Sequence, residues 1–193
     1  MLYGYDMTAF SEQQQVQIHT LAKGIKANNS GLVCPFLYVE FKGDDPLWIA
    51  ANQCAGGSTS CVNIAERLKT QLRDSECKLE EAGCINSAAF SIAINGSEAR
   101  LHVSWKGSEL DYFMQRVKTF ALQEEDQYLH FRKYVRNIID WGKDMRLDGI
   151  RSSLNTLLEE HRKRESTAAK ARPPPSESSG FSPASGTKKR RTS

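Results

Sequence analysis

The chain has 193 residues, a formal net charge of +3, 39% hydrophobic residues and 25% charged residues. This length and composition are typical of one soluble globular domain with a core of its own. No apolar run approaches the roughly 20 residues of a membrane span, and the first residues do not resemble a secretory signal peptide. The five cysteines are an odd number, which favours reduced thiols over a disulfide framework. The sequence therefore predicts an intracellular protein that does not bind membranes.

The charge is distributed unevenly along the chain. Residues 165–193 carry +4 and are rich in proline and serine, whereas residues 1–164 carry −1. This difference predicts a globular domain over 1–164 and a disordered basic tail over 165–193. A near-neutral domain argues against a broad electropositive surface, so a nucleic-acid site would have to be a local groove.

The tail ends in a cluster of four basic residues, Lys188, Lys189, Arg190 and Arg191. Clusters of this kind are typical of short nuclear import signals, so they predict an import receptor as a partner and a nuclear location. The alternative is a tail that keeps the protein soluble or binds polyanions weakly.

The first half of the domain predicts a strand, a helix, a strand and a second helix. Residues 1–6 form the short strand, and Ser11 caps a helix from Glu12 to about Gly31. Aromatic and β-branched residues over Pro35–Lys42 predict the next strand. The following helix is expected to include Cys61 and to reach about Leu72, with Gly56 and Gly57 near a bend or a close contact with the sheet.

The second half predicts three strands followed by a long helical segment. Residues 89–94 and 99–105 form a hairpin, in which Asn95 and Gly96 are expected to adopt a type I′ turn. Residues 110–122 form a further strand, and residues 125–158 are helical, with an interruption at Gly142 or Gly149. The order predicts an α+β (mixed α/β) domain, with a central, mostly antiparallel sheet flanked by helices.

The strand Pro35–Lys42 carries the candidate chemistry. Because side chains alternate along a strand, Phe36, Tyr38, Glu40 and Lys42 are expected to share one face. Glu40 and Lys42 then form a Glu-x-Lys pair, in which the carboxylate would bind a divalent metal and the ammonium would stabilise a phosphate. On spacing alone, a solvent-exposed strand face is the favoured explanation of the pair, because Glu-x-Lys occurs on many strands by chance.

Several blocks of the sequence resemble an uncharacterised fungal family of domains of unknown function. They include Asn28–Gly43, Leu47–Ser58, Phe90–Arg100, Val103–Lys106 and Phe131–Gly142. That family is remotely similar to PD-(D/E)XK nucleases. The resemblance implies a restriction-endonuclease-like core, Mg²⁺ as cofactor and nucleic acid as partner, with Glu40 and Lys42 as catalytic residues and Glu40 as a metal ligand.

The nuclease pattern also requires an aspartate, which in the family precedes a Tyr-Gly-Tyr block. Here the block is Tyr3-Gly4-Tyr5, at the start of the chain, so the matching aspartate is not in the sequence. Asp6 is the nearest acid and the candidate second metal ligand, and Glu12 is another. Gln53, at the expected start of the second helix, is the third candidate catalytic residue.

Asn52, Gln53, Ser58 and Asn63 form a polar set within an apolar stretch. They could contact phosphate, or they could cap the helix and form buried hydrogen bonds. The cysteine spacings do not match a zinc site, and no phosphate-binding glycine motif is present. Two functions remain open: a nuclease-like domain that is inactive or weakly active, and a Mg²⁺-dependent phosphodiesterase that uses Glu40 and Lys42.

Overall fold

The computed structural model describes residues 1–20, 27, 31–43, 45–74, 85–108 and 110–170. Five strands form one sheet in the order β1-β2-β3-β4-β5. All neighbouring strands are antiparallel except β2 and β3, which are parallel. The predicted α+β class and mostly antiparallel sheet are confirmed.

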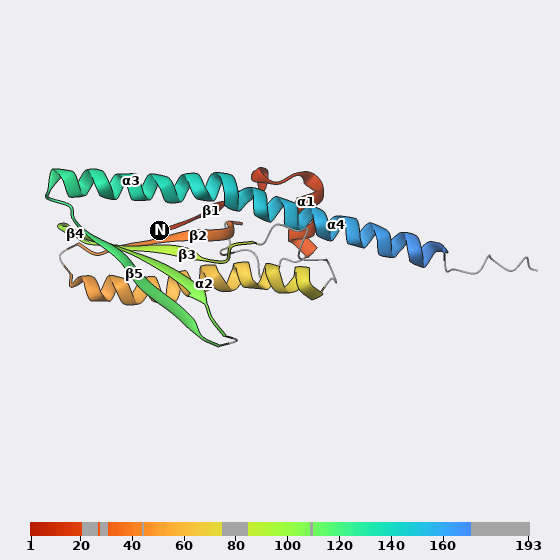
Figure 1. The fold of residues 1–193 in the computed structure, drawn as a ribbon, viewed down its shortest axis with the longest axis horizontal. Helices are drawn as coiled ribbons and strands as arrows, with labels where there is room; N and C mark the ends of the chain where they lie inside the picture. The colour runs from red at the N-terminus through yellow and green to blue at the C-terminus, as the bar shows by residue number, and fades with distance from the viewer. Residues whose placement is uncertain (21–26, 28–30, 44, 75–84, 109, 171–193) are drawn as a thin grey trace, which may run out of the picture.

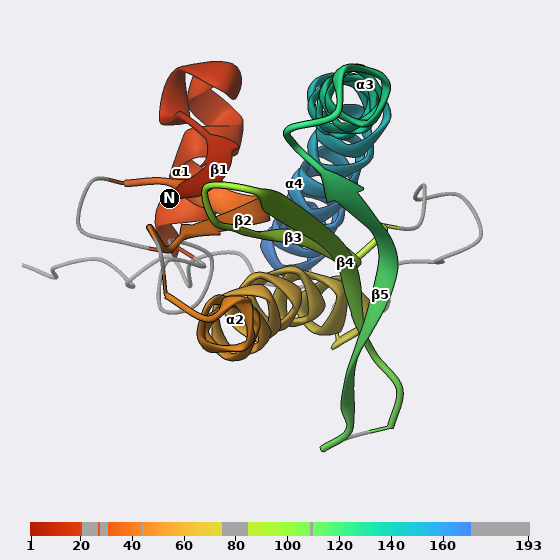
Figure 2. The same ribbon diagram turned by 90° about the vertical axis from the view of Figure 1, so that its left-hand side faces the viewer.

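The sheet lies between two helical layers (Figures 1 and 2). Helix α2 (Leu47–Asp74) covers one face and packs on β2, β3 and β4. On the other face lie α1 (Glu12–Thr20), α3 (Glu125–Trp141) and α4 (Leu147–Lys170). No helix in the described part of the chain is long and apolar enough to span a membrane.

The N-terminal segment forms one edge of the sheet and then crosses to the helical layer. Strand β1 (Leu2–Tyr5) is followed by a short 3₁₀ helix, η1 (Met7–Ala9), and by α1. The predicted cap of α1 is present, because the Gln14 N–H donates to Ser11 Oγ at 3.4 Å and the Ser11 N–H donates to Gln14 Oε1 at 3.1 Å. Most of the predicted end of this helix, residues 28–30, lies outside the described residues, and Gly31 is not helical and has a positive φ of 80°.

Strand β2 (Val33–Phe41) begins two residues before its predicted start. Pro35 is tolerated inside it because β3 pairs with β2 only from Leu37 onward, so the missing N–H leaves no gap in that ladder. The pairing with β1 shifts register opposite this segment, and Cys34 has a positive φ of 42°. The start of β2 is therefore irregular.

This irregular start corrects one prediction about side-chain faces. Phe36 packs edge-on against Trp141 at 6.0 Å between ring centroids, on the side of α3. Tyr38 instead lies against Gly57 of α2. The predicted common face is therefore wrong for Phe36, because regular alternation does not extend to the distorted beginning of the strand.

Helix α2 connects the parallel strands β2 and β3 (Ala89–Ile94) and is continuous. The prediction that the helix starts near Gln53 is wrong, since α2 begins at Leu47. The prediction of a close contact at the two glycines is confirmed at Gly57: a Cβ there would lie 2.6 Å from Cδ2 of Tyr38. Burial of the apolar face of α2 offsets the low helix propensity of these glycines.

The hairpin is formed by β3 and β4 (Glu98–Lys106), and β5 (Tyr112–Ala121) completes the sheet. The predicted type I′ turn is wrong. Among the described residues, positive φ occurs at Cys34 and Gly31 and not at Asn95 or Gly96. Asn95 Oδ1 instead accepts hydrogen bonds from the backbone N–H groups of Ser97 and Glu98, at 3.1 and 2.8 Å, and stabilises a longer turn.

The C-terminal helices are joined by a π-helical turn, η2 (Gly142–Arg146). The predicted interruption is thus at Gly142, where the glycine lets Phe36 approach the backbone. The predicted start of the tail at Glu165 falls inside α4, which continues to Lys170. The hydroxyls of Ser166 and Thr167 donate to the Lys163 carbonyl and support this last turn. The basic cluster at 188–191 lies outside the described residues.

The guanidinium of Arg146 is buried where η2 meets β1 and β2. Its side chain is 3% exposed and lies 5.5–5.8 Å from the ring centroids of Tyr5, Phe36 and Trp141. It donates to the carbonyl oxygen of Cys34 at 2.8 Å. This contact fixes the strained start of β2 against the C-terminal helices.

Candidate functional site

Glu40 and Lys42 lie side by side at the end of β2, an internal strand. Lys42 Nζ is 3.1 Å from Glu40 Oε1, and the Tyr38 hydroxyl donates to Glu40 Oε2 at 2.8 Å. The side chains of Glu40 and Lys42 are 17% and 23% exposed. All three side chains come from alternate positions of one strand, as the sequence predicted for Tyr38, Glu40 and Lys42.

The surroundings keep Glu40 ionised. The hydrogen bond from Tyr38, followed by that from Lys42, holds the pKa of Glu40 below its ordinary value against the opposing effect of burial. Burial, together with the hydrogen bond to Glu40, raises the pKa of Tyr38 to about 12. At neutral pH Glu40 is therefore a carboxylate and Tyr38 a neutral phenol.

Tyr38 is positioned by Gly57, and replacing that glycine tests the arrangement. We expect Gly57→Ala to push the Tyr38 ring away from α2 and to weaken its hydrogen bond to Glu40, at a cost of about 1–3 kcal/mol in unfolding free energy. Chemical denaturation measures this cost, and Gly56→Ala is the matched control because a Cβ there meets no atom within 4 Å. Equal stability of the two variants would contradict the close contact.

The structure does not bring the candidate second acids to Glu40. Tyr5 pairs with Val33, which is about 23 Å along β2 from Glu40 at about 3.3 Å per residue, and Asp6 lies beyond Tyr5. Its carboxylate instead accepts hydrogen bonds from the Thr8 N–H and hydroxyl, at 2.9 and 2.8 Å. Glu12 is exposed at the start of α1, in the helical layer opposite α2.

The register of β1 identifies where a partner carboxylate would have to lie. Leu2 pairs with Tyr38, and the terminal amine of Met1 donates to the Val39 carbonyl at 2.6 Å. A residue placed immediately before Met1 would therefore stand opposite Glu40 and on the same face, about 5 Å away between Cβ atoms. The resemblance to nucleases likewise predicts an aspartate ahead of the Tyr3-Gly4-Tyr5 block.

The residues of the polar set on α2 differ in their exposure and in their hydrogen bonds. Gln53 and Asn52 are exposed within the helix, and no hydrogen bond joins Gln53 to Glu40 or Lys42 in the described part of the chain. Ser58 is buried and donates to the Cys54 carbonyl at 2.7 Å, and its Oγ lies 2.8 Å from the Oγ of Ser104. The buried hydrogen-bonding role is thus confirmed for Ser58.

The residues present do not form a magnesium site by themselves. In the described ranges there is no group of three or more His, Cys, Asp or Glu side chains that could hold a metal ion. Both oxygens of Glu40 already accept from Tyr38 and Lys42. Mg²⁺ prefers six oxygen ligands in octahedral geometry and loses water reluctantly, so one engaged carboxylate is a poor site.

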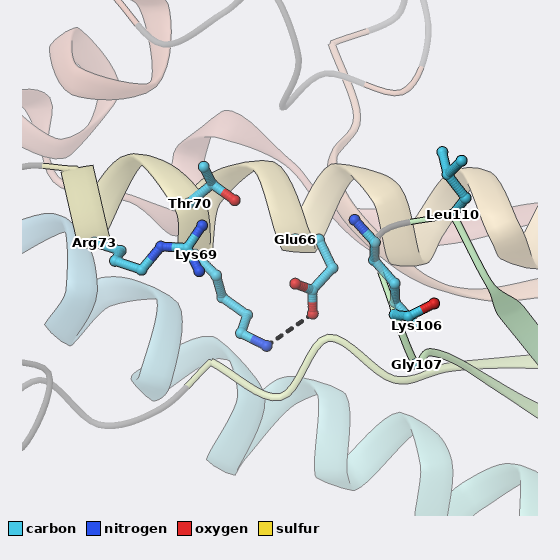
Figure 3. Close-up of a pocket in the computed structure, with 8 residues that line it drawn as sticks. Glu66, Lys69, Thr70, Arg73, Lys106, Gly107 and Leu110 are labelled. Carbon is cyan, nitrogen blue, oxygen red and sulfur yellow. Dashed lines mark hydrogen bonds and ion pairs between the residues drawn. The ribbon is translucent and has the colours of Figure 1, made fainter.

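A groove lies near the C-terminal end of α2 (Figure 3). It has a volume of about 580 Å³, and its lining comes from α2, from the last residue of β4 and from the segment that follows β4. Lys69 Nζ is 2.7 Å from Glu66 Oε1, whereas Arg73 and Lys106 add two further cations. Sequence reasoning missed this groove, because its residues come from segments that only the fold brings together.

Tyr38 is the functional side chain that sequence reasoning named but did not use. The signal was present, since Tyr38 precedes Glu40 by two residues and a glycine of α2 is needed to accommodate its ring.

Comparisons with known proteins give a family but no function. No curated protein and no solved structure matches the chain. A family described as a domain of unknown function, DUF7924, matches residues 1–154, which include β1, the Glu40–Lys42 pair and the sheet. The chain therefore belongs to the DUF7924 family.

Proposed function

We propose that this chain is a nuclease-like domain of the PD-(D/E)XK type whose catalytic centre is incomplete, so that it cleaves nucleic acid weakly or not at all. The observation that carries the proposal is the pairing of Glu40 and Lys42 on one face of an internal strand. Helix α2 follows this strand in the chain and connects it to β3, which pairs with it in parallel. A carboxylate and a lysine in this position are the groups that such a centre uses.

The proposed lack of activity follows from the single carboxylate. Lys42 neutralises Glu40 at 3.1 Å, and the fold brings neither Asp6 nor Glu12 to Glu40. A metal-dependent nuclease needs more than one anionic ligand to hold Mg²⁺ against its hydration. Glu40 and Lys42 can position a phosphate or a water, but these two residues alone do not complete a metal site.

An added aspartate tests whether the centre is incomplete. We expect a Pro-Asp extension before Met1 to strengthen Mg²⁺ binding by about tenfold or more, because it places a second carboxylate opposite Glu40. We also expect it to produce metal-dependent cleavage. Calorimetry measures Mg²⁺ affinity, and cleavage is assayed on plasmid and single-stranded DNA with Mg²⁺ or Mn²⁺ against EDTA.

Three controls separate a gain of chemistry from other effects of the extension. A Pro-Asn extension keeps the shape without the charge, and Glu40→Gln in the extended chain removes the first carboxylate. Both should cleave no more than background, and Lys42→Ala should slow cleavage more than it weakens DNA binding. Robust Glu40-dependent cleavage by the unextended chain would contradict an incomplete centre and favour an active phosphodiesterase. An extension without effect on Mg²⁺ affinity would contradict the β1 register argument.

A further inference from the structure

Strand β5 forms an edge of the sheet and carries positive charge without compensating acids. Its ten residues, Tyr112–Ala121, include Arg116 and Lys118 and no carboxylate. Arg116 is exposed, and Lys118 Nζ lies 5.5 Å from the ring centroids of Phe120 and Tyr134. Neither cation has an acidic partner within 4.0 Å among the described residues.

An aromatic pair is exposed at the projecting end of the same strand. Trp105 of β4 and Phe113 of β5 stack with their ring centroids 5.7 Å apart and an interplanar angle of 23°. They are 36% and 49% exposed, respectively, although large aromatic side chains are usually covered. Figure 2 shows this end of β4 and β5 projecting past α2.

A pocket of about 280 Å³ lies between the sheet and α3, next to β5. Its walls are mostly apolar and aromatic, and Asn137 adds an amide. The other lining residues are Phe90, Leu101, Val117, Tyr134, Ile138 and Trp141. Val117 is 49% exposed and Tyr134 is 37% exposed, so the opening is accessible. The volume suits one flat ring system with a hydrogen-bonding edge and is small for a larger ligand.

Exposed cations of α3 lie beside this pocket. Arg132, Lys133 and Arg136 are exposed within a nine-residue stretch, 129–137, that contains no carboxylate, and Asp140 follows one turn later. Lys133 and Asn137 are four residues apart and so are neighbours on the helix surface. The pocket is therefore flanked by cations from both β5 and α3.

Charge excludes a second copy of this chain as the occupant of the edge. Antiparallel pairing of two β5 strands about their middle would place Arg116 and Lys118 of one copy against the same residues of the other. Like charges opposite each other in a sheet are destabilising, and basic residues on an edge strand oppose such pairing. The ligand that fits has flat apolar faces and repeated negative charge.

We propose that this surface, made by Trp105, Phe113, Val117, Lys118 and Tyr134, binds single-stranded nucleic acid. Bases stack on the Trp105–Phe113 pair and enter the pocket beside Val117 and Tyr134, while Lys118 and Lys133 contact phosphates. Arg116 pairs with His102 and lies on the opposite face of β5, whereas Lys118 and the exposed rings share the face turned away from α2. The proposal goes beyond the proposed function and does not depend on Glu40 or Lys42, which lie on the face covered by α2.

Fluorescence anisotropy of the full chain with labelled 20-nucleotide DNA and RNA single strands, and with a duplex, tests the proposal. We expect Phe113→Ala to weaken single-strand binding by about fivefold or more, the cost of one base stack. We expect Lys118→Ala to weaken binding and to reduce the slope of log K against log salt by about 0.7, as one lost phosphate contact requires. The C-terminal tail is common to all variants, so differences report on the domain.

Matched variants locate the surface. Tyr3→Ala removes an exposed aromatic residue from the opposite edge strand, and Arg73→Ala removes an exposed cation from the α2 groove of Figure 3. Both should bind as the unmodified chain does. A larger loss with Arg73→Ala than with Lys118→Ala would overturn the proposal and place binding at the α2 groove. Duplex binding as tight as single-strand binding, or no effect of Phe113→Ala, would also overturn it. Tighter binding of the DNA or of the RNA strand identifies the kind of nucleic acid that the surface prefers.

Discussion

Replacing Arg146 by alanine is expected to lower the free energy of unfolding by about 3 kcal/mol or more. The guanidinium is buried, donates to the Cys34 carbonyl at 2.8 Å and to the Tyr5 hydroxyl at 3.3 Å, and contacts three aromatic rings. The alanine variant would leave a cavity and buried acceptors without a donor. Urea unfolding followed by circular dichroism measures the loss.

Arg146→Met separates the two causes of that loss. Methionine fills much of the volume and packs against aromatic rings, but it cannot donate to the Cys34 carbonyl. It also removes a buried charge that has no carboxylate within 4.0 Å in the described residues, which is favourable. We therefore expect the methionine variant to be more stable than the alanine variant. An alanine variant as stable as the unmodified chain would show that the cluster does not support the start of β2.

Phe120→Ala is expected to cost about 3–5 kcal/mol, the usual range for removing a buried phenylalanine. Phe120 is 0% exposed and contacts Phe131 and Tyr134 of α3, with ring centroids 5.5 and 5.4 Å away. It therefore connects β5 to the helical layer. Differential scanning calorimetry or urea unfolding measures the effect.

Phe113→Ala is the matched control, because it removes the same side chain from the same strand. Phe113 is 49% exposed and packs on Trp105, so the expected cost is about 1 kcal/mol or less. This small cost also keeps the variant folded for the binding experiment. Similar losses at the two positions would contradict the burial that distinguishes them.

Local patterns were sufficient to predict the elements and the face of the candidate pair. The alternation of β2 places Tyr38, Glu40 and Lys42 together because these residues follow a regular strand. The hairpin of β3 and β4 was predicted because Asn95 marks the turn, although its side chain acts there by accepting backbone hydrogen bonds instead of allowing positive φ.

Features that depend on contacts between residues far apart in the sequence were not predictable from local patterns. The face of Phe36 depends on the irregular start of β2, which is held by a residue of η2 more than a hundred positions later. The separation of Asp6 from Glu40 depends on the antiparallel register of β1, since proximity in sequence does not give proximity across a sheet. The close approach of α2 to the sheet at Gly57 depends on the Tyr38 ring, which comes from another segment of the chain.

The burial of Cys34, Cys54 and Cys61 has a consequence for the chemical reactivity of the chain. Burial raises the pKa of these thiols to about 11, 11 and 12, respectively, and their exposed fractions are 1% or less. Alkylating reagents attack the thiolate, so the folded protein offers neither the ionised sulfur nor a path to it. Modification at these three positions must wait for the surrounding structure to open. Their alkylation rates therefore record how often α2 and the start of β2 separate from the sheet, under conditions in which the protein remains overwhelmingly folded.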